Sequence, residues 1–442
     1  MGRAFLKRAA NLGCQGASRE RDLFSSRPRA RGGKGAGALL DRRRLKAPRS
    51  PTHDSEKQGN VLIIAPMTQD LSDQPSGLQR IARLTPLAAV LARIDAQVEA
   101  VKPQRWATPA TLGYTLAEDI VTSERPAHPI ALRDGFAVDA GAVADAGAYT
   151  PMPLPSPIRR IDLGEPMPAG TDAVLPLDAV VFRGEQAEAV ASVFAGEGVL
   201  PAGGDTPPHG IMRRAGQRIR SIDIAAVHAA GIKSAPMREP RIAVVMGVEP
   251  TLPVSGVAGL LVHSVFAAGA TVSNKPAMTL DSAIADDQND AIVAFGGTGS
   301  GRNDHAVQAL ARLGRVEIHG IAISPGETTA FGFAGARPVL LVPGRLDAAL
   351  AAWMLIGDRI VARLSGRAVE AQTTLLPLKR KVTSTIGMTE LVPVSCQDGM
   401  AEPLASGYLS FMSLAQSNGW IAVPAESEGF PAGTEVAVHP WP

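Results

Sequence analysis

The spacing of apolar residues changes several times along the chain and predicts which segments are helices and which are strands. Apolar positions three and four residues apart predict helices over 85–94, 108–118 and 221–231. The first two segments open with Thr-Pro, which favours a threonine N-cap followed by proline at the first helical position. From about Ile120 to Ala202, short strand-like runs separated by prolines predict a β-rich segment.

Residues 241–366 alternate between short apolar runs and amphipathic segments, as in a parallel sheet with crossover helices. Strands are expected at 241–246, 291–295, 316–323 and 339–342. Helices are expected over 257–268, 305–313 and 347–364. From about Leu375 the tail returns to short strands, at 391–394, 420–423 and 435–439, which predict a small β-barrel or sandwich.

Each of the four expected strands of the parallel sheet ends in a turn that contains glycine. These turns lie at 246–249, 296–301, 324–326 and 343–344. Because the carboxyl ends of parallel strands lie along one edge of an open sheet, the turns should line one crevice. Their convergence is better evidence for a binding site than any single turn.

The turn at 296–301 reads Gly-Gly-Thr-Gly-Ser-Gly and is followed by Arg302 and, two residues later, Asp304. A strand, a glycine turn and a helix in succession present backbone N–H groups to an anion, and glycine lets the backbone approach a ligand closely. Asp304 stands where a carboxylate could hold a metal or position a water, and also where a helix N-cap belongs. The motif is neither a Walker P-loop nor the dinucleotide GxGxxG pattern, so a structural turn and a ligand site stay equally open.

Composition narrows the class of protein. A chain of 442 residues is long enough for two to four domains. It contains no apolar run of the ~20 residues that span a membrane. The two cysteines, Cys14 and Cys396, lie outside any CxxC or Cys/His cluster, which argues against a disulfide framework and a structural zinc site. We expect a cytoplasmic protein with no membrane partner.

The net charge of +2 hides an uneven distribution. Residues 1–66 carry 15 Lys and Arg against 5 Asp and Glu, a balance of +10, so the remainder carries −8. This basic segment has no sustained hydrophobic period and should not fold by itself. Three interpretations compete: a nucleic-acid-binding arm, an Arg-rich targeting segment, or upstream sequence translated from a start site set before Met67. The third is favoured, and nucleic acid is not an expected partner.

Several short motifs occur together in a specific order and spacing. They are Asp134-Gly-Phe-Ala, Pro168-Ala-Gly-Thr-Asp-Ala-Val, the 296–304 segment, Pro325-Gly326, Val342-Pro-Gly344, and Ser406 with Asn418-Gly419. In these motifs the chain resembles the MoeA and gephyrin E-domain family, the molybdopterin molybdenumtransferases, from about residue 78 to residue 442.

The resemblance implies a multidomain α/β fold with a MogA-like, doubly wound parallel-sheet domain at 239–372 that binds molybdopterin. It further implies a helical linker and dimerisation domain at 75–120 and 203–238, a β-rich inserted domain at 121–202 and a small C-terminal β-barrel at 373–442. Residues 1–74 precede these domains as the basic segment. A homodimer is expected.

The reaction implied by the resemblance inserts molybdate into adenylylated molybdopterin and releases AMP, with Mg²⁺ or another divalent metal. Several negative charges then meet in one cleft, so carboxylates should hold the metal while cations or backbone N–H groups offset the anions. By their place in the motifs, Asp134, Glu249 and Asp304 are the expected catalytic and metal-binding residues. Their simpler roles would be a turn cap, an exposed loop glutamate and a helix N-cap.

The two lysines of the family's cationic motif are missing from this chain. Where the family has Lys-Pro-Gly-Lys-Pro, the chain has Ser324-Pro-Gly-Glu-Thr328, so Ser324 and Glu327 replace the two lysines. Arg302 and Arg345 should face the same crevice and could replace the lost cations, because arginine binds phosphate bidentately. The expected substrate-binding residues are Gly296, Gly297, Thr298, Gly299, Ser300, Gly301, Arg302, Pro325, Gly326, Pro343, Gly344, Arg345 and Ser406.

Two functions therefore stay open. The first is a divergent molybdenumtransferase that acts on molybdopterin and molybdate. The second is a catalytically degenerate scaffold that binds molybdopterin and delivers cofactor to a specific molybdoenzyme. A molybdoenzyme or a MogA-type protein is the expected partner protein.

Overall fold

The structure is a computed structural model that describes residues 79, 81–247, 252–273, 278–368 and 373–442. The predictions for the basic segment 1–74 and for Glu249 concern residues outside these ranges. None of the described helices has the length and apolar character needed to cross a membrane.

Of the two helices predicted in the N-terminal part of the described chain, one forms and the other does not. Helix α2 (Leu87–Gln97) is confirmed, although its N-cap is Pro86 and no side chain caps it. The predicted helix at 108–118 is wrong: only a 3-10 turn, η1 (Thr108–Ala110), forms, and strand β2 (Thr115–Leu116) follows. Gly113 lies between them with φ +81°, a left-handed conformation that a helix cannot continue through.

Strand β2 joins a small sheet, with order β1-β13-β2, formed by β1 (Gln104–Ala107) and β13 (Ser234–Arg238). The predicted helix at 221–231 is confirmed as α3 (Ser221–Ala229). Strands β3 (Ile120–Val121) and β12 (Ile211–Arg213) pair as the chain passes into the β-rich segment and returns from it.

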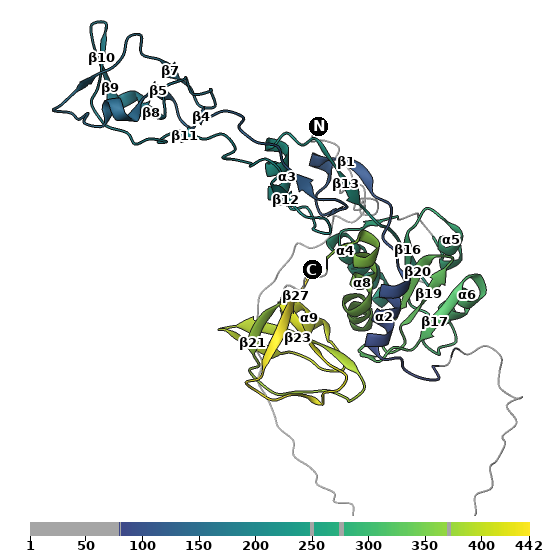
Figure 1. Ribbon diagram of the computed structural model, residues 1–442. Coiled ribbons are helices and arrows are strands. Elements are labelled where there is room, and N and C mark those ends of the chain that lie inside the picture. Colours follow the sequence, from purple (N-terminus) through teal and green to yellow (C-terminus); the bar gives the residue numbers. More distant parts are fainter. Residues whose placement is uncertain (1–78, 80, 248–251, 274–277, 369–372) are drawn as a thin grey trace, which may run out of the picture. The chain divides into compact units, whose positions relative to one another are not determined.

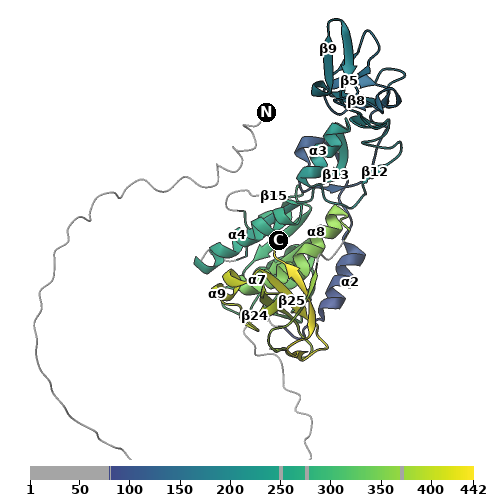
Figure 2. The same cartoon turned by 90° about the vertical axis from the view of Figure 1, so that its left-hand side faces the viewer.

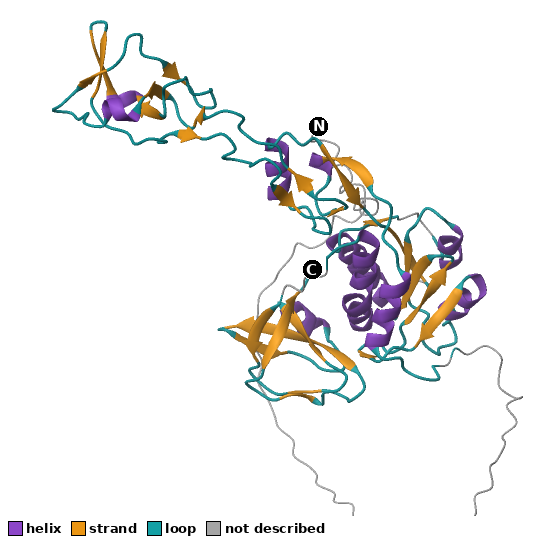
Figure 3. Cartoon of the chain, in the orientation of Figure 1, coloured by secondary structure: helices purple, strands orange, loops and turns teal. Residues whose placement is uncertain are grey.

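The segment from 121 to 202 consists of short strands and loops with short 3-10 turns, as predicted (Figure 3). Its two three-stranded sheets have the orders β7-β5-β8 and β6-β10-β9, and β11 pairs with β4. The strands are β4 (Ile130–Ala131), β5 (Gly135–Val138), β6 (Met152–Pro153), β7 (Arg160–Ile161), β8 (Ala173–Pro176), β9 (Val180–Arg183), β10 (Gln186–Ala189) and β11 (Val199–Leu200).

A six-stranded sheet with the order β15-β14-β16-β20-β19-β17 forms the centre of the next part of the chain. Strands β14 (Arg241–Met246), β16 (Ala291–Phe295) and β20 (Arg337–Val342) confirm three predicted strands and pair in parallel, and β15 (Thr271–Val272) joins them. Two further strands extend the sheet in antiparallel fashion: β19 (Ala330–Ala334) and β17 (Arg315–His319).

The predicted strand at 316–323 is two strands that belong to different sheets. β17 pairs with β19, which the sequence analysis did not predict, and β18 (Ile323–Ser324) pairs in parallel with β23 (Thr389–Gln397) of the tail. Gly320 separates the two with φ +94°, so the backbone changes direction inside what looks like one apolar run.

Helices cover both faces of the six-stranded sheet (Figures 1 and 2). One face carries α2, α4 (Leu252–Ala267), and the run α7 (Leu346–Ala352), π-helical turn η4 (Trp353–Gly357) and α8 (Asp358–Ser365). The other face carries α5 (Leu280–Ala285) and α6 (Ala306–Leu313). Alternate residues of β16 face the two cores, and all five are buried, which explains its continuous apolar sequence.

The tail forms strands where they are predicted, around one apolar core. Its main sheet has the order β18-β23-β25-β27-β21, with β24 paired to β23. The remaining elements are β21 (Thr374–Pro377), β22 (Val382–Thr383), β24 (Met400–Pro403), α9 (Phe411–Gln416), β25 (Gly419–Val423), β26 (Gly429–Phe430) and β27 (Glu435–Pro440). The small barrel expected for this region stays a prediction.

Candidate functional site

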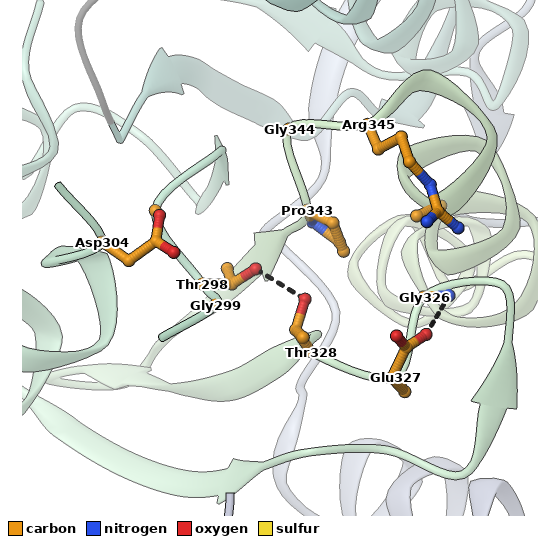
Figure 4. Close-up of a pocket in the computed structure, with 11 residues that line it drawn as sticks. Thr298, Gly299, Asp304, Gly326, Glu327, Thr328, Pro343, Gly344 and Arg345 are labelled. Atoms are coloured by element: carbon orange, nitrogen blue, oxygen red, sulfur yellow. Dashed lines mark hydrogen bonds between the residues drawn. The ribbon is translucent and has the colours of Figure 1, made fainter. Parts of the chain in front are cut away.

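Three of the four predicted glycine turns line one cavity of about 230 Å³ (Figure 4). The first turn follows β16, the second follows β18 and the third follows β20. The lining residues are Gly297, Thr298, Gly299, Asp304, Gly326, Glu327, Thr328, Pro343, Gly344, Arg345 and Ala348. The fourth turn, after β14, falls mostly outside the described residues.

The carboxylate of Asp304 folds back over the glycine turn. Its Oδ2 accepts a hydrogen bond from Gly301 N at 2.8 Å. A Cβ atom on Gly299 or Gly301 would lie only 2.8 or 2.9 Å from this same oxygen, so a side chain at either position would displace the carboxylate. Asp304 is not the N-cap of α6, because that position belongs to His305, which makes no capping hydrogen bond with its side chain.

The capping of α6 comes from Gln79, more than two hundred residues away in sequence. Its Oε1 accepts from the backbone N–H groups of Val307 and Gln308, at 2.8 and 3.1 Å. Its Nε2 donates to the carbonyl oxygens of Gly297 and Gly299, both at 2.9 Å. One buried amide therefore ties the glycine turn to the helix that follows it. Sequence reasoning missed Gln79, because no local pattern marks a capping residue so distant in the chain.

Two threonines join the first and second turns across the cavity. The hydroxyls of Thr298 and Thr328 lie 3.0 Å apart, and Thr298 is buried (Figure 4). Behind them, Nε2 of His319 lies 3.0 Å from the carbonyl oxygen of Thr298. This contact gives His319 a structural role in the turn. Asp304 and Glu327 lie on opposite sides of the threonine pair (Figure 4).

Arg345 reaches the cavity from the third turn and is held by two neighbours. Its Nε donates to Oδ1 of Asp347 at 2.7 Å, and its guanidinium lies 5.7 Å from the ring centroid of Tyr408. Asp347 is buried and also accepts from the backbone N–H groups of Ala348 and Leu409. The tail thus helps to orient Arg345, and within the described residues its two terminal nitrogens make no hydrogen bond or ion pair.

The charges around the cavity are unequal. Among the described lining residues, Asp304 and Glu327 are acidic and Arg345 is the cation. Glu327 is exposed, and its Oε2 accepts from Gly326 N at 3.1 Å. The substitution of a family lysine by Glu327 therefore lies at the cavity itself.

The remaining predicted site residues do not line this cavity. Asp134 accepts from Leu163 N at 2.8 Å and lies beside β5 of the β-rich segment. Ser406 donates to Oε1 of the buried Glu390 at 2.7 Å. Arg302 is exposed in the loop after the glycine turn. Gly296, Ser300, Gly301 and Pro325 flank the lining residues without belonging to them.

Within the described ranges, no three His, Cys, Asp or Glu side chains are grouped in a way that could hold a metal ion. Glu249, one of the three predicted metal ligands, falls outside those ranges. The metal site expected from Asp134, Glu249 and Asp304 stays a prediction.

Fold and cavity together define a multidomain α/β protein with a cavity at the carboxyl ends of parallel strands. Three family models match successive parts of the chain: "MoeA N-terminal region (domain I and II)" at 85–231, "Probable molybdopterin binding domain" at 262–363 and "MoeA C-terminal region (domain IV)" at 376–441. The chain belongs to the MoeA family of molybdopterin biosynthesis proteins.

Similar proteins support this assignment. A molybdopterin molybdenumtransferase 1 of Mycobacterium tuberculosis is 26% identical over 423 residues, which cover 78% of this chain and 96% of that protein. A Methanocaldococcus jannaschii protein named for molybdopterin biosynthesis is 33% identical over 155 residues, and the chain spans only 36% of its length. The crystal structure of a molybdopterin biosynthesis moeA protein from Pyrococcus horikoshii covers 81% of this chain and all of its own, with a TM-score of 0.63 and 21% identity, and shows the same fold.

Proposed function

We propose that the protein acts in molybdenum cofactor biosynthesis, inserting molybdate into adenylylated molybdopterin with release of AMP. The observation that carries the proposal is the convergence of three strand-end turns on one cavity. All three turns lie in the part of the chain that the molybdopterin-binding model matches. The mycobacterial relative, which is named as a molybdenumtransferase, is similar over almost its whole length.

Two features of the cavity suit a phosphate-bearing ligand. The glycine turn lets the ligand approach the backbone closely, and the α6 N-terminus lies directly behind it. Arg345 offers two guanidinium nitrogens in a fixed orientation, because Asp347 holds its Nε. In this proposal Arg345 binds the phosphate of the pterin substrate, the role of one of the lysines that the chain lacks.

The donor chemistry of the cavity also fits a divalent cation. Asp304 and Glu327 each use one carboxylate oxygen on a backbone N–H group, and the other oxygen could hold Mg²⁺. Substrate oxygens and water would complete the coordination. When bound, the cation would act as a Lewis acid on the phosphate bond that breaks. Asp134 does not line this cavity and Glu249 lies outside the described residues, so their part in metal binding stays a separate prediction.

Reconstitution tests the proposal directly. Purified protein is incubated with adenylylated molybdopterin, molybdate and Mg²⁺, and AMP release is measured together with activation of an apo-molybdoenzyme. We expect Arg345→Ala to lower the rate by about a hundredfold, because an oriented charged hydrogen bond to phosphate is lost. Arg312→Ala, which removes an exposed arginine paired with Asp281, is the matched control. AMP release no faster than the uncatalysed background would refute turnover.

One observation favours the second candidate function, a binding and delivery scaffold without catalysis. Glu327 and Thr328, which depart from the family's lysine-containing pattern, line the cavity itself. This alternative predicts tight binding of molybdopterin without AMP release, and a stable complex with an apo-molybdoenzyme. Absence of molybdopterin binding would exclude this alternative.

The homodimer also belongs to the proposal, and light scattering of the purified protein tests the oligomeric state.

A further inference from the structure

A second cavity, of about 300 Å³, lies where the end of α8 meets the segment around Gly216. Three arginines line it: Arg238, Arg363 and Arg367. Among the described residues that line it, none is acidic. We call it the arginine cavity. Like charges crowded at one place raise the free energy of the folded state unless something offsets them, so their presence calls for an explanation.

The ordinary role of arginines at a helix end is to bind the free carbonyl oxygens of the last turn, and here that role is already filled. Gly366 ends α8 in the left-handed conformation, with φ +62°. The carbonyl oxygens of the last turn accept backbone N–H groups instead. Gly366 N donates to Arg363 O at 3.1 Å, Arg367 N to Ala362 O at 2.8 Å, and Val101 N to Leu364 O at 2.7 Å.

Existing ion pairs offset only part of the charge. Arg367 binds both carboxylate oxygens of Asp358 at 2.7 Å through one terminal nitrogen, while its buried Nε has no hydrogen-bond partner among the described residues. Arg363 lies 3.9 Å from Asp95, whose two oxygens are already bound by Arg359 at 2.7 and 2.6 Å. A buried donor of this kind favours an acceptor nearby, because an unsatisfied N–H group destabilises the folded state.

The third arginine has the most capacity to bind a ligand. Nε of Arg238 donates to the carbonyl oxygen of Val101 at 3.2 Å. Within the described parts of the chain, its two terminal nitrogens make no hydrogen bond or ion pair. The guanidinium is thus held in place through Nε, and the N–H groups of its two terminal nitrogens are available to an acceptor in the cavity.

A fourth arginine adds positive charge near the cavity. The guanidinium of Arg218 donates to the carbonyl oxygens of Gly113 and Ala267, at 3.1 and 2.5 Å, and is partly buried. Burial lowers the pKa of Arg218, and the nearby charge of Arg367 lowers it further, while Asp358 opposes this change. Its carbonyl partners carry no charge that would neutralise it.

We propose that the arginine cavity binds a phosphate-class oxyanion, separately from the glycine-turn cavity. The two parallel N–H donors of a guanidinium match the spacing of two phosphate oxygens. The cavity is also large enough for a phosphate group carried by a small molecule. The inference does not rest on the proposed function, because none of its residues lines the glycine-turn cavity.

Isothermal titration of the full chain with inorganic phosphate, pyrophosphate and AMP, at constant ionic strength, tests the proposal. The three probes separate free phosphate from a phosphate ester. We expect at least one to bind, and Arg238→Ala and Arg363→Ala each to weaken that binding by about tenfold or more. Arg238→Lys should restore part of the affinity, because it keeps the charge and loses the fork.

Two controls distinguish the site from general electrostatics and from the glycine-turn cavity. Arg183→Ala removes an exposed arginine paired with Glu188 in the β-rich segment and should leave phosphate binding unchanged. In an Arg345→Ala background, which weakens anion binding in the glycine-turn cavity, the loss of binding caused by Arg238→Ala should persist. If Arg238→Ala does not fold, Arg363→Ala decides the question, because its side chain is 43% exposed. Lack of binding of all three probes at millimolar concentration, or binding that neither substitution weakens, would overturn the proposal.

Discussion

The glycine-turn cavity and the arginine cavity have similar volumes, about 230 and 300 Å³, but their side chains carry opposite charges. Two carboxylates and one arginine line the first, and three arginines line the second. The first is built from backbone turns at the ends of strands. The second is built from long side chains at a helix end.

This difference shows two ways in which a protein chain can form a binding site for an anionic ligand. In the glycine-turn cavity, glycine backbone and one oriented arginine approach the ligand, and the carboxylates would require a divalent cation between them and a phosphate. In the arginine cavity, the cations are permanent and need no metal. We therefore expect anion binding to depend on Mg²⁺ in the first cavity and not in the second.

Among the substitutions that test this comparison, the largest expected effect shows whether the geometry of the glycine turn depends on Gln79. Gln79→Ala removes four hydrogen bonds, and we expect a local loss of about 2 kcal/mol, or roughly thirtyfold faster amide exchange at Val307 and Gln308. Molybdopterin affinity should fall with it, while phosphate binding in the arginine cavity should not change. Hydrogen exchange read by mass spectrometry, together with titration, measures both.

Gln79→Glu distinguishes the contribution of the acceptor oxygen of this amide from that of its donor nitrogen. A carboxylate still accepts from Val307 and Gln308 but cannot donate to Gly297 and Gly299. Exchange at the helix should stay slow while molybdopterin binding weakens. Gln186→Ala, at an amide that makes long contacts in the β-rich segment, is the matched control. Wild-type affinity in Gln79→Ala would show that the turn keeps its shape without this residue.

The second prediction makes the glycine-turn cavity resemble the arginine cavity in charge. Glu327→Lys replaces an acid by a base at its rim, and we expect molybdopterin to bind about tenfold more tightly and with less dependence on Mg²⁺. Titration with and without chelator measures the change. Glu185→Lys, the same charge change at an exposed position between β9 and β10, is the control. Unchanged affinity would mean that position 327 does not face the bound anion.

The smallest effect concerns the carboxylate beside the arginine cavity. Asp358→Asn removes the negative charge that pairs with Arg367, so we expect phosphate to bind about threefold more tightly. Asp281→Asn, which removes a comparable exposed partner of Arg312, should have no effect on titration. Weaker binding in Asp358→Asn would contradict the prediction and indicate that Asp358 orients Arg367.

Local patterns predicted much of the fold because local residues determine those elements. The run at 291–295 is apolar throughout, and β16 is indeed buried on both faces. The helix at 305–313 follows from apolar spacing on one face, and the structure places α6 there. The rule that parallel strands end at one sheet edge accounts for two of the three turns that line the cavity, those after β16 and β20. The third turn follows β18, which belongs to the tail's sheet.

The errors arose where a distant part of the chain decides the local conformation. The segment at 316–323 divides between two sheets because two different strands, the nearby β19 and the distant β23, supply its hydrogen-bond partners. Residues 108–118 carry helical spacing, but β2 pairs with β13, with Leu116 opposite Met237, and this pairing makes the segment part of a sheet. The sequence makes Asp304 a candidate N-cap of α6. In the structure, Gln79 instead accepts the hydrogen bond from a backbone N–H group of the first helical turn.

The sequence by itself determined the strand and helix pattern, the glycine turns, the family resemblance and the missing lysines, because each depends on residues close together in the chain. Only the tertiary structure decided that Glu327 lies in the same cavity as the glycine turn and that the tail orients Arg345. It also decided that Arg238 meets the end of α8. Charge balance depends on distances in space, and packing between distant segments sets those distances.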